Sequence, residues 1–266
     1  MLSDAHCHPC DLAQIFTESE TERRRLGVLA ASSACGMDEF AYNEKLSHNA
    51  AQDKAAPLLP CFGIHPQVFK IWNERGTNNN ELLAKLDMLA SEGRIAAIGE
   101  CGFDLYNAAF RETEKTQDQY FTSQIETALK FNLPVVIHVR RAMHKIFAMA
   151  RILSKCRAVI FHSWPGTFEE ALSLLKRGVN AYFSFGNVIM LNHKQALRSC
   201  ALLPAQRVLT ETDAPYQMRR GESFSQWADL PLILEAAATL RSKAGNNITA
   251  KELEMQIEAN FRNAFV

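Results

Sequence analysis

Histidines and carboxylates follow short apolar stretches at several places in this sequence of 266 residues. Near the start, Asp4, His6 and His8 occupy alternate positions, so in an extended chain their side chains point the same way. Two imidazoles spaced in this way can share one metal ion. The alternative is a turn with incidental histidines, and the later motifs argue against it.

Two further histidines end later apolar stretches. Val135–Arg140 carries His138 and Arg140 at alternate positions, and His162 ends the stretch that begins at Val159. A lone histidine after an apolar strand is usually a packed core residue. Two in successive strands, added to the pair at the start of the chain, favour a metal site.

Carboxylates follow other stretches. Glu100, in Gly99–Asp104, can bridge two cations, although taken alone it is more typical of a strand-end salt bridge. Asp213, in Glu211–Pro215, can both hold an ion and receive a proton from water, which suits a catalytic aspartate. We therefore predict a metal-dependent hydrolase with one or two divalent ions, held by His6, His8, Glu100, His138, His162 and Asp213.

The donor types leave the metal open. Four imidazoles and two carboxylates are compatible with zinc, with manganese or, together with water, with magnesium. Cys7 and Cys10 could add thiolates and favour zinc, but Cys7 alternates away from the two histidines beside it.

The elements that position these residues follow a βα pattern. Eight short apolar stretches alternate with segments of helical period, which predicts a parallel sheet closed into a (β/α)8 TIM barrel, typically about 250 residues in one domain. We expect residues 1–266 to form this single domain. The predicted strands are Leu2–Ala5, Val28–Ser32, Leu58–Gly63, Ile95–Glu100, Val135–Val139, Ala158–His162, Ala181–Phe185 and Val208–Thr210.

Helices are expected between the strands. Thr249 and Glu252 form a capping box before the last of them. Residues 76–80 are expected to be a surface loop. The predicted helices are Met37–Lys54, Glu81–Ser91, Glu114–Phe131, Ala142–Ser154, Phe168–Arg177, Leu230–Arg241 and Ala250–Phe265.

Composition limits the possible partners and compartment. The 29 basic and 29 acidic residues give a formal net charge of +0, so the chain lacks the general positive field of a protein that coats DNA. The seven scattered cysteines do not suggest a disulfide framework. No apolar run reaches the roughly 18 to 20 residues that span a bilayer, so we expect a cytoplasmic protein without membrane contact.

Taken in order, the motifs resemble those of the TatD family of metal-dependent deoxyribonucleases. The resemblance runs from Asp4 to Phe265 and rests on Asp-x-His-x-His, Gly-Ile-His-Pro, Gly-Glu-x-Gly-x-Asp, His-x-Arg, Phe-His-Ser and Glu-Thr-Asp-x-Pro. Each motif is short, but the ordered set is highly specific.

The resemblance implies roles for individual residues. His6, His8 and Asp213 would hold one ion, His138 and His162 the other, and Glu100 would bridge them. The family favours Mg²⁺ or Mn²⁺ in use. Two ions about 3.5 to 4 Å apart would activate a shared water for attack on phosphorus, with Asp213 as the proton acceptor. His65, Arg140 and Glu211 would be non-ligand neighbours.

DNA or another phosphoester is the expected substrate. His65 and Arg140 could hold phosphate oxygens, and Trp164 or Tyr216 could stack on an unpaired base, unless these aromatics are ordinary loop packing. Trp164 lies in His162–Gly166, which departs from the family's usual Cys-Phe-Ser-Gly, and the loop Arg219–Trp227 lacks the family's usual ending. These departures concern the substrate more than the metals.

Two other functions remain open. The same fold could hydrolyse a small phosphoester, an amide or a lactone, because the metal site alone does not choose among these. A non-catalytic metal-binding homologue is the third possibility, although every proposed ligand and the proposed base are present.

Overall fold

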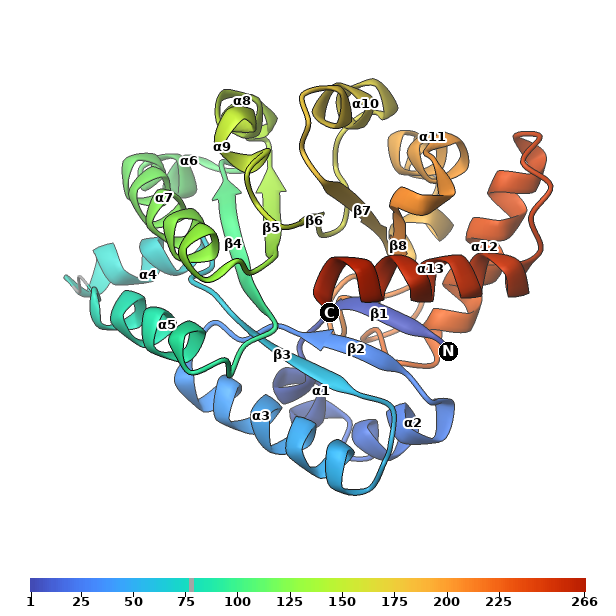
Figure 1. Ribbon diagram of the computed structural model, residues 1–266, viewed down its shortest axis with the longest axis horizontal. Helices are drawn as coiled ribbons and strands as arrows, with labels where there is room; N and C mark the ends of the chain where they lie inside the picture. The colour runs from blue at the N-terminus through green and yellow to red at the C-terminus, as the bar shows by residue number, and fades with distance from the viewer. Residues whose placement is uncertain (77–78) are drawn as a thin grey trace.

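Eight parallel strands neighbour one another in chain order, from β1 to β8, and helices surround them (Figure 1). The computed structural model describes residues 1–76 and 79–266. This arrangement confirms the predicted (β/α)8 barrel. The strands are β1 (Ser3–Cys7), β2 (Leu29–Ser32), β3 (Leu58–Phe62), β4 (Ala97–Asp104), β5 (Val135–Arg140), β6 (Val159–Phe161), β7 (Ala181–Phe185) and β8 (Val208–Thr210).

The first and last strands meet, so the sheet nearly closes. The Thr210 hydroxyl donates to the Ser3 carbonyl at 2.7 Å. Beyond the strand ends, the Asp213 N–H donates to the His6 carbonyl at 2.9 Å, and the His8 N–H to the Ala214 carbonyl at 2.8 Å. These bonds bring the ends of β1 and β8 together.

One strand is longer than predicted. The sequence predicted a fourth strand over Ile95–Glu100, whereas β4 runs from Ala97 to Asp104. Gly102 permits the extension, because a Cβ atom there would lie 2.0 Å from the His138 carbonyl oxygen on β5. Both Glu100 and Asp104 therefore lie within β4, with their side chains on the same face of the strand.

The helices agree with most predictions. The capping box of Thr249 and Glu252 is present. The prediction of one helix over Ala142–Ser154 was wrong, because two short helices divide that segment. The expected loop at 76–80 lies partly outside the described residues. Helices near the predicted ranges are α3 (Met37–Gln52), α5 (Glu81–Ser91), α7 (Glu114–Phe131), α8 (Met143–Ala148), α9 (Ala150–Leu153), α10 (Phe168–Lys176), α12 (Asp229–Lys243) and α13 (Ala250–Phe265).

Several helices had not been predicted by range. They are α1 (Pro9–Ile15), α2 (Ser19–Leu26), α4 (Val68–Arg75), α6 (Ala108–Arg111) and α11 (Lys194–Leu202), with 3-10 turns η1 (Asn187–Met190) and η2 (Ala205–Arg207). Among the described residues, no helix is long and apolar enough to cross a membrane.

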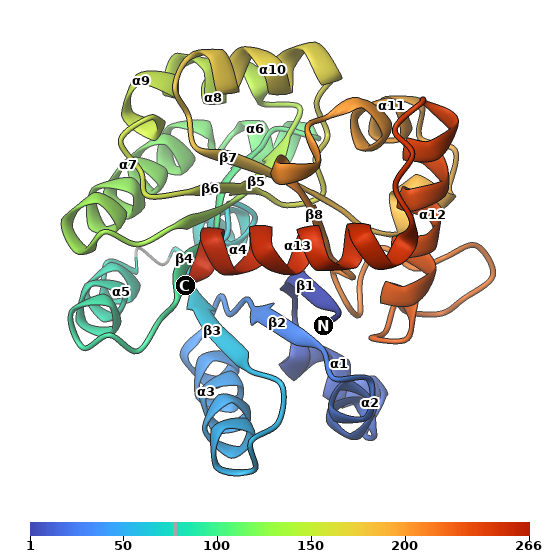
Figure 2. The same ribbon diagram turned by 45° about the vertical axis from the view of Figure 1, so that its right-hand side comes forward.

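The last helix covers one end of the barrel. Figure 2 shows α13 lying across the strands beside β1 and β8. Its residues Phe261 and Phe265 pack with Ala5 and Leu29 of the barrel interior, and Asn260 donates to the carbonyl of Val208 at the start of β8. Helix α13 thus covers the amino ends of the strands. The carboxyl ends, where such barrels place their active sites, are left uncovered by this helix.

Candidate metal centre

The predicted ligands converge at the carboxyl ends of five strands. His6 lies in β1 and His8 directly after it, Glu100 in β4 and His138 in β5, and the other two follow β6 and β8. His65, which follows β3, joins them. Most of these side chains are buried, with Glu100 only 3% exposed and Asp213 7%.

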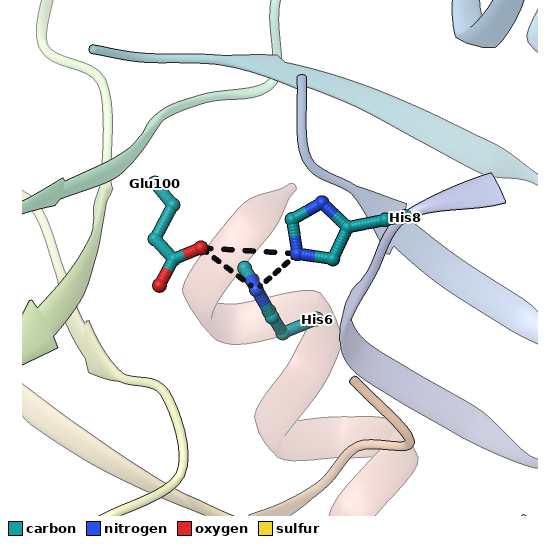
Figure 3. A group of neighbouring side chains, drawn as sticks. All are labelled: His6, His8 and Glu100. Atoms are coloured by element: carbon teal, nitrogen blue, oxygen red, sulfur yellow. Dashed lines mark hydrogen bonds and ion pairs between the residues drawn. The ribbon is translucent and has the colours of Figure 1, made fainter. Parts of the chain in front are cut away.

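Glu100 stands at the middle of the group. Its Oε2 lies 3.2 Å from Nε2 of His6 and 3.8 Å from Nε2 of His8. Figure 3 draws these three side chains pointing toward one another. The Oε1 of Glu100 lies 2.8 Å from Nδ1 of His138 and 3.3 Å from Nε2 of His162. Each carboxylate oxygen therefore faces a different pair of imidazoles, which is the arrangement a bridging ligand requires.

Asp213 completes the side of the group near β1. Its Oδ1 lies 3.5 Å from the Nε2 atoms of both His6 and His8. The His6 and His8 nitrogens are themselves 3.1 Å apart. Three nitrogen and oxygen donors thus point at one small volume, as ligands of a common ion do.

His65 lies closer to the centre than its predicted role implies. Its Nε2 is 3.4 Å from Glu100 Oε1, and its ring is edge-on to His138 at 4.6 Å between centroids. His65, Glu100 and His138 form one of three donor groups whose ligand atoms lie within 4.8 Å of one another. None of these groups, among the described residues, includes a cysteine, and Cys7 instead donates to the Ala31 carbonyl on β2.

The donor chemistry fits divalent cations. Burial alone would raise the pKa of Glu100, but the charges of His65, His162 and His6 outweigh it and hold this pKa well below its usual value. Burial alone would also raise the pKa of Asp213. The charge of His162 and the hydrogen bond with His8 outweigh burial and lower this pKa. Two ionised carboxylates among imidazole nitrogens form a set that zinc, manganese or magnesium accepts.

Three of the histidines are oriented by groups that the sequence had not assigned to this task. Ser33 Oγ lies 3.0 Å from Nδ1 of His6, and Asp104 Oδ2 lies 3.3 Å from Nε2 of His138. Glu211, expected as a non-ligand neighbour, places Oε1 3.2 Å from Nδ1 of His162. Partners of this kind fix the ring and its tautomer, which aims the other nitrogen at the ion.

Asp213 has its own orienting residue. The Gln217 amide donates to Asp213 Oδ2 at 2.7 Å and in turn accepts from the Ser163 hydroxyl at 3.0 Å. Asp213 Oδ1 is thereby left facing the histidines. The sequence did contain an indication that Asp104 belongs to the site, because its spacing from Glu100 places both side chains on one face of a strand. Nothing in the sequence indicated the role of Gln217.

Three of the predicted substrate residues line the cavity in front of the centre, namely His65, Arg140 and Tyr216. This cavity has a volume of about 690 Å³, and its walls include Arg140 and Tyr216. Tyr216 is 49% exposed, lies edge-on to His8 and donates its hydroxyl hydrogen to Asp11 at 2.8 Å. Arg140 also lines a second cavity of about 400 Å³, so it stands between the two.

Trp164 occupies a different environment. Its side chain is 2% exposed, and its ring packs edge-on against Phe161 and Phe183. Gly166 lies against the same ring, because a Cβ atom there would be 2.4 Å from it. The structure thus shows the packing alternative for Trp164, whose side chain borders the second cavity but is almost wholly buried.

Barrel and centre together define a metal-dependent hydrolase of the (β/α)8 class, and comparison with known proteins narrows the class. The family model described as "TatD related DNase" matches residues 3–266. The chain belongs to this family.

Two curated relatives are consistent with this family assignment. A protein of Cronobacter sakazakii named "3'-5' ssDNA/RNA exonuclease TatD" is 36% identical over 221 residues, which cover 79% of each chain. A protein of the same name from Cronobacter turicensis is 32% identical over 219 residues, again 79% of each chain.

A solved structure has the same fold. The Escherichia coli protein YJJV, described as a TatD homolog, superimposes with a TM-score of 0.84 at 21% identity, covering 99% of this chain and 97% of that one. At this identity the likeness concerns the fold.

Proposed function

We propose that this chain is a two-metal nuclease that hydrolyses phosphodiester bonds of DNA, in single strands or at strand ends, with residues 1–266 acting as one domain. The observation that carries the proposal is the placement of Glu100, whose two oxygens face separate groups of histidines. The names of the curated relatives, which specify single-stranded DNA and RNA, support nucleic acid as the substrate class.

The distances around Glu100 and Asp213 support the proposed ligands. His6, His8 and Asp213 would hold one ion, His138 and His162 the second, with Glu100 between them. We propose Mg²⁺ or Mn²⁺ in use, with Zn²⁺ also compatible. Such ions would supply Lewis acidity, which lowers the pKa of an attacking water and neutralises charge on the phosphate.

The remaining steps fall to side chains. Asp213 accepts the proton of the attacking water, since its carboxylate lies at the centre and Gln217 holds one of its oxygens. His65 and Arg140 bind the non-bridging phosphate oxygens from the cavity wall. Tyr216, half exposed beside His8, stacks on an unpaired base.

We also propose that the protein works in the cytoplasm. All seven cysteines of the described residues are free thiols, and most are buried. Unpaired thiols in this number suit a reducing compartment.

The test uses single-stranded DNA labelled at either the 3′ or the 5′ end, incubated with Mg²⁺, Mn²⁺, Zn²⁺ or EDTA. The wild-type protein should produce a ladder of products only when metal is present, and Asp213→Asn should produce no ladder. The end from which the ladder starts gives the polarity. Absence of cleavage with every metal, together with turnover of small phosphoesters, amides or lactones, would contradict the proposal and favour a small-substrate hydrolase.

A further inference from the structure

Three arginines surround one exposed tyrosine at the rim of the centre. Tyr106, which follows β4, is 41% exposed. The guanidinium carbon of Arg140 lies 3.6 Å from its ring centroid, and that of Arg141 lies 4.6 Å away. Arg111, on α6, reaches the carbonyls of Leu105 and Tyr106 at 3.3 and 3.5 Å. We call Arg111, Arg140, Arg141 and Tyr106 the arginine patch.

Strand pairing builds this patch next to the site. Asp104 of β4 is in register with Arg140 of β5, and the Leu105 N–H donates to the Arg140 carbonyl at 2.9 Å. Arg140 is two residues from His138 on the same strand and lines both cavities that contain His138 and Asp213. The patch therefore begins at the metal centre and continues outward through Tyr106.

The charge of the patch is not neutralised. Across residues 1–76 and 79–266, no carboxylate forms an ion pair with any of its three arginines. On α7, the next helix after α6, the carboxylates of Glu114 and Asp118 pair with Lys145. Two guanidinium groups that share one ring repel each other, so the arrangement favours a bound anion that offsets their charge.

We propose that the arginine patch binds consecutive phosphates of a single-stranded nucleic acid whose scissile phosphate lies at the metal centre. The proposal rests on the proposed nuclease function and extends binding from Arg140, already assigned to the scissile phosphate, to Arg111 and Arg141 outside the catalytic residues. Arginine forks suit phosphate oxygens, and an aromatic platform keeps the guanidinium planes in place. The near-zero net charge of the whole chain makes such a local positive site more important for substrate binding.

The test measures binding without cleavage. A fluorescent single-stranded DNA 12-mer is titrated with protein in EDTA at several salt concentrations, and log K is plotted against log salt. Each phosphate contact on a single strand contributes about −0.7 to this slope. Arg141→Ala and Arg111→Ala should each reduce the slope by about 0.7, whereas Arg141→Lys should preserve it.

Two further variants sharpen the result. Tyr106→Leu should weaken binding, and Tyr106→Phe should restore it, because phenylalanine keeps the platform. Arg25→Ala is the matched control. Arg25 is an exposed arginine near the end of α2, just before β2, and so lies at the opposite end of the barrel. The Arg25→Ala variant should therefore leave the slope unchanged.

The outcomes separate this inference from the proposed function. Metal-dependent cleavage with unaltered slopes in Arg141→Ala and Arg111→Ala would overturn the arginine patch alone. Reduced slopes without cleavage under any metal would overturn the nuclease while supporting the patch. If a mononucleotide bound as tightly as the 12-mer, the patch would be a single-anion site, which would also overturn the inference.

Discussion

Replacing Asp104 by asparagine tests whether the partners behind the proposed ligands set the metal affinity. Asp104 is fully buried, and its Oδ2 lies 3.3 Å from Nε2 of His138. The other nitrogen of that ring, Nδ1, lies 2.8 Å from Glu100 Oε1. A carboxylate at Nε2 keeps the proton there and leaves Nδ1 free to bind an ion.

Asparagine preserves the shape but places an NH₂ group where Asp104 Oδ2 accepts from the Gln67 amide at 2.7 Å and faces His138. Its carbonyl can still accept from the Tyr106 N–H, as Asp104 Oδ1 does at 2.9 Å. Its NH₂ group then faces Nε2 of His138, which favours a ring that carries its proton on Nδ1, the nitrogen needed for the ion. Loss of such a partner typically lowers metal affinity about 10- to 100-fold, or about 1.4 to 2.8 kcal/mol.

The assay is calorimetric titration of metal-free protein with Mn²⁺. Asp87→Asn is the matched control, because Asp87 pairs with Lys130 on the surface and is 44% exposed. Asp104→Asn should bind the ion more weakly by the factor given above, and Asp104→Glu should recover part of the loss. Wild-type affinity in Asp104→Asn, or equal weakening in Asp87→Asn, would refute the reasoning.

Three other predictions concern activity and stability. Gln217→Leu should lower kcat about 10-fold, since it removes a charge-assisted hydrogen bond to Asp213; an unchanged kcat in steady-state kinetics would count against the positioning role. Arg23→Met should lower the free energy of unfolding by about 2 to 4 kcal/mol, because Arg23 Nη1 binds two carbonyls at 2.8 Å in a buried position. In urea titration, Arg24→Met should lower the free energy of unfolding by less than about 1 kcal/mol, because the salt bridges of Arg24 are more exposed. EDTA should lower Tm by about 5 to 10 °C if the ions were present at about 100 times Kd, as measured by calorimetry; equal Tm values would argue against metal bound to the folded state.

The sequence was most informative where apolar strands end in ligand-type residues. His138 and His162 could be placed because buried strand residues come directly before each, and a barrel brings such strand ends to one face. The length of β4 could not be predicted, because its extension depends on Gly102 fitting against a carbonyl of β5. That contact joins residues that are distant in sequence.

The orienting residues show the same limit. Ser33 and His6 are 27 positions apart, and Ser163 and Gln217 are 54 apart. No local pattern marks such pairs. Trp164 was expected in the substrate cleft as one alternative, but its neighbours Phe161 and Phe183 come from adjacent strands, and this decides for packing. The break between α8 and α9 has no glycine or proline to signal it.

The most direct test of the central claim is the number of Mn²⁺ ions bound per chain, counted by electron paramagnetic resonance during titration of metal-free protein. The geometry around Glu100 predicts two ions for wild type and one for His162→Ala, which removes a ligand from only one proposed ion. One ion in wild type, or two in the variant with unchanged affinity, would contradict the two-metal centre.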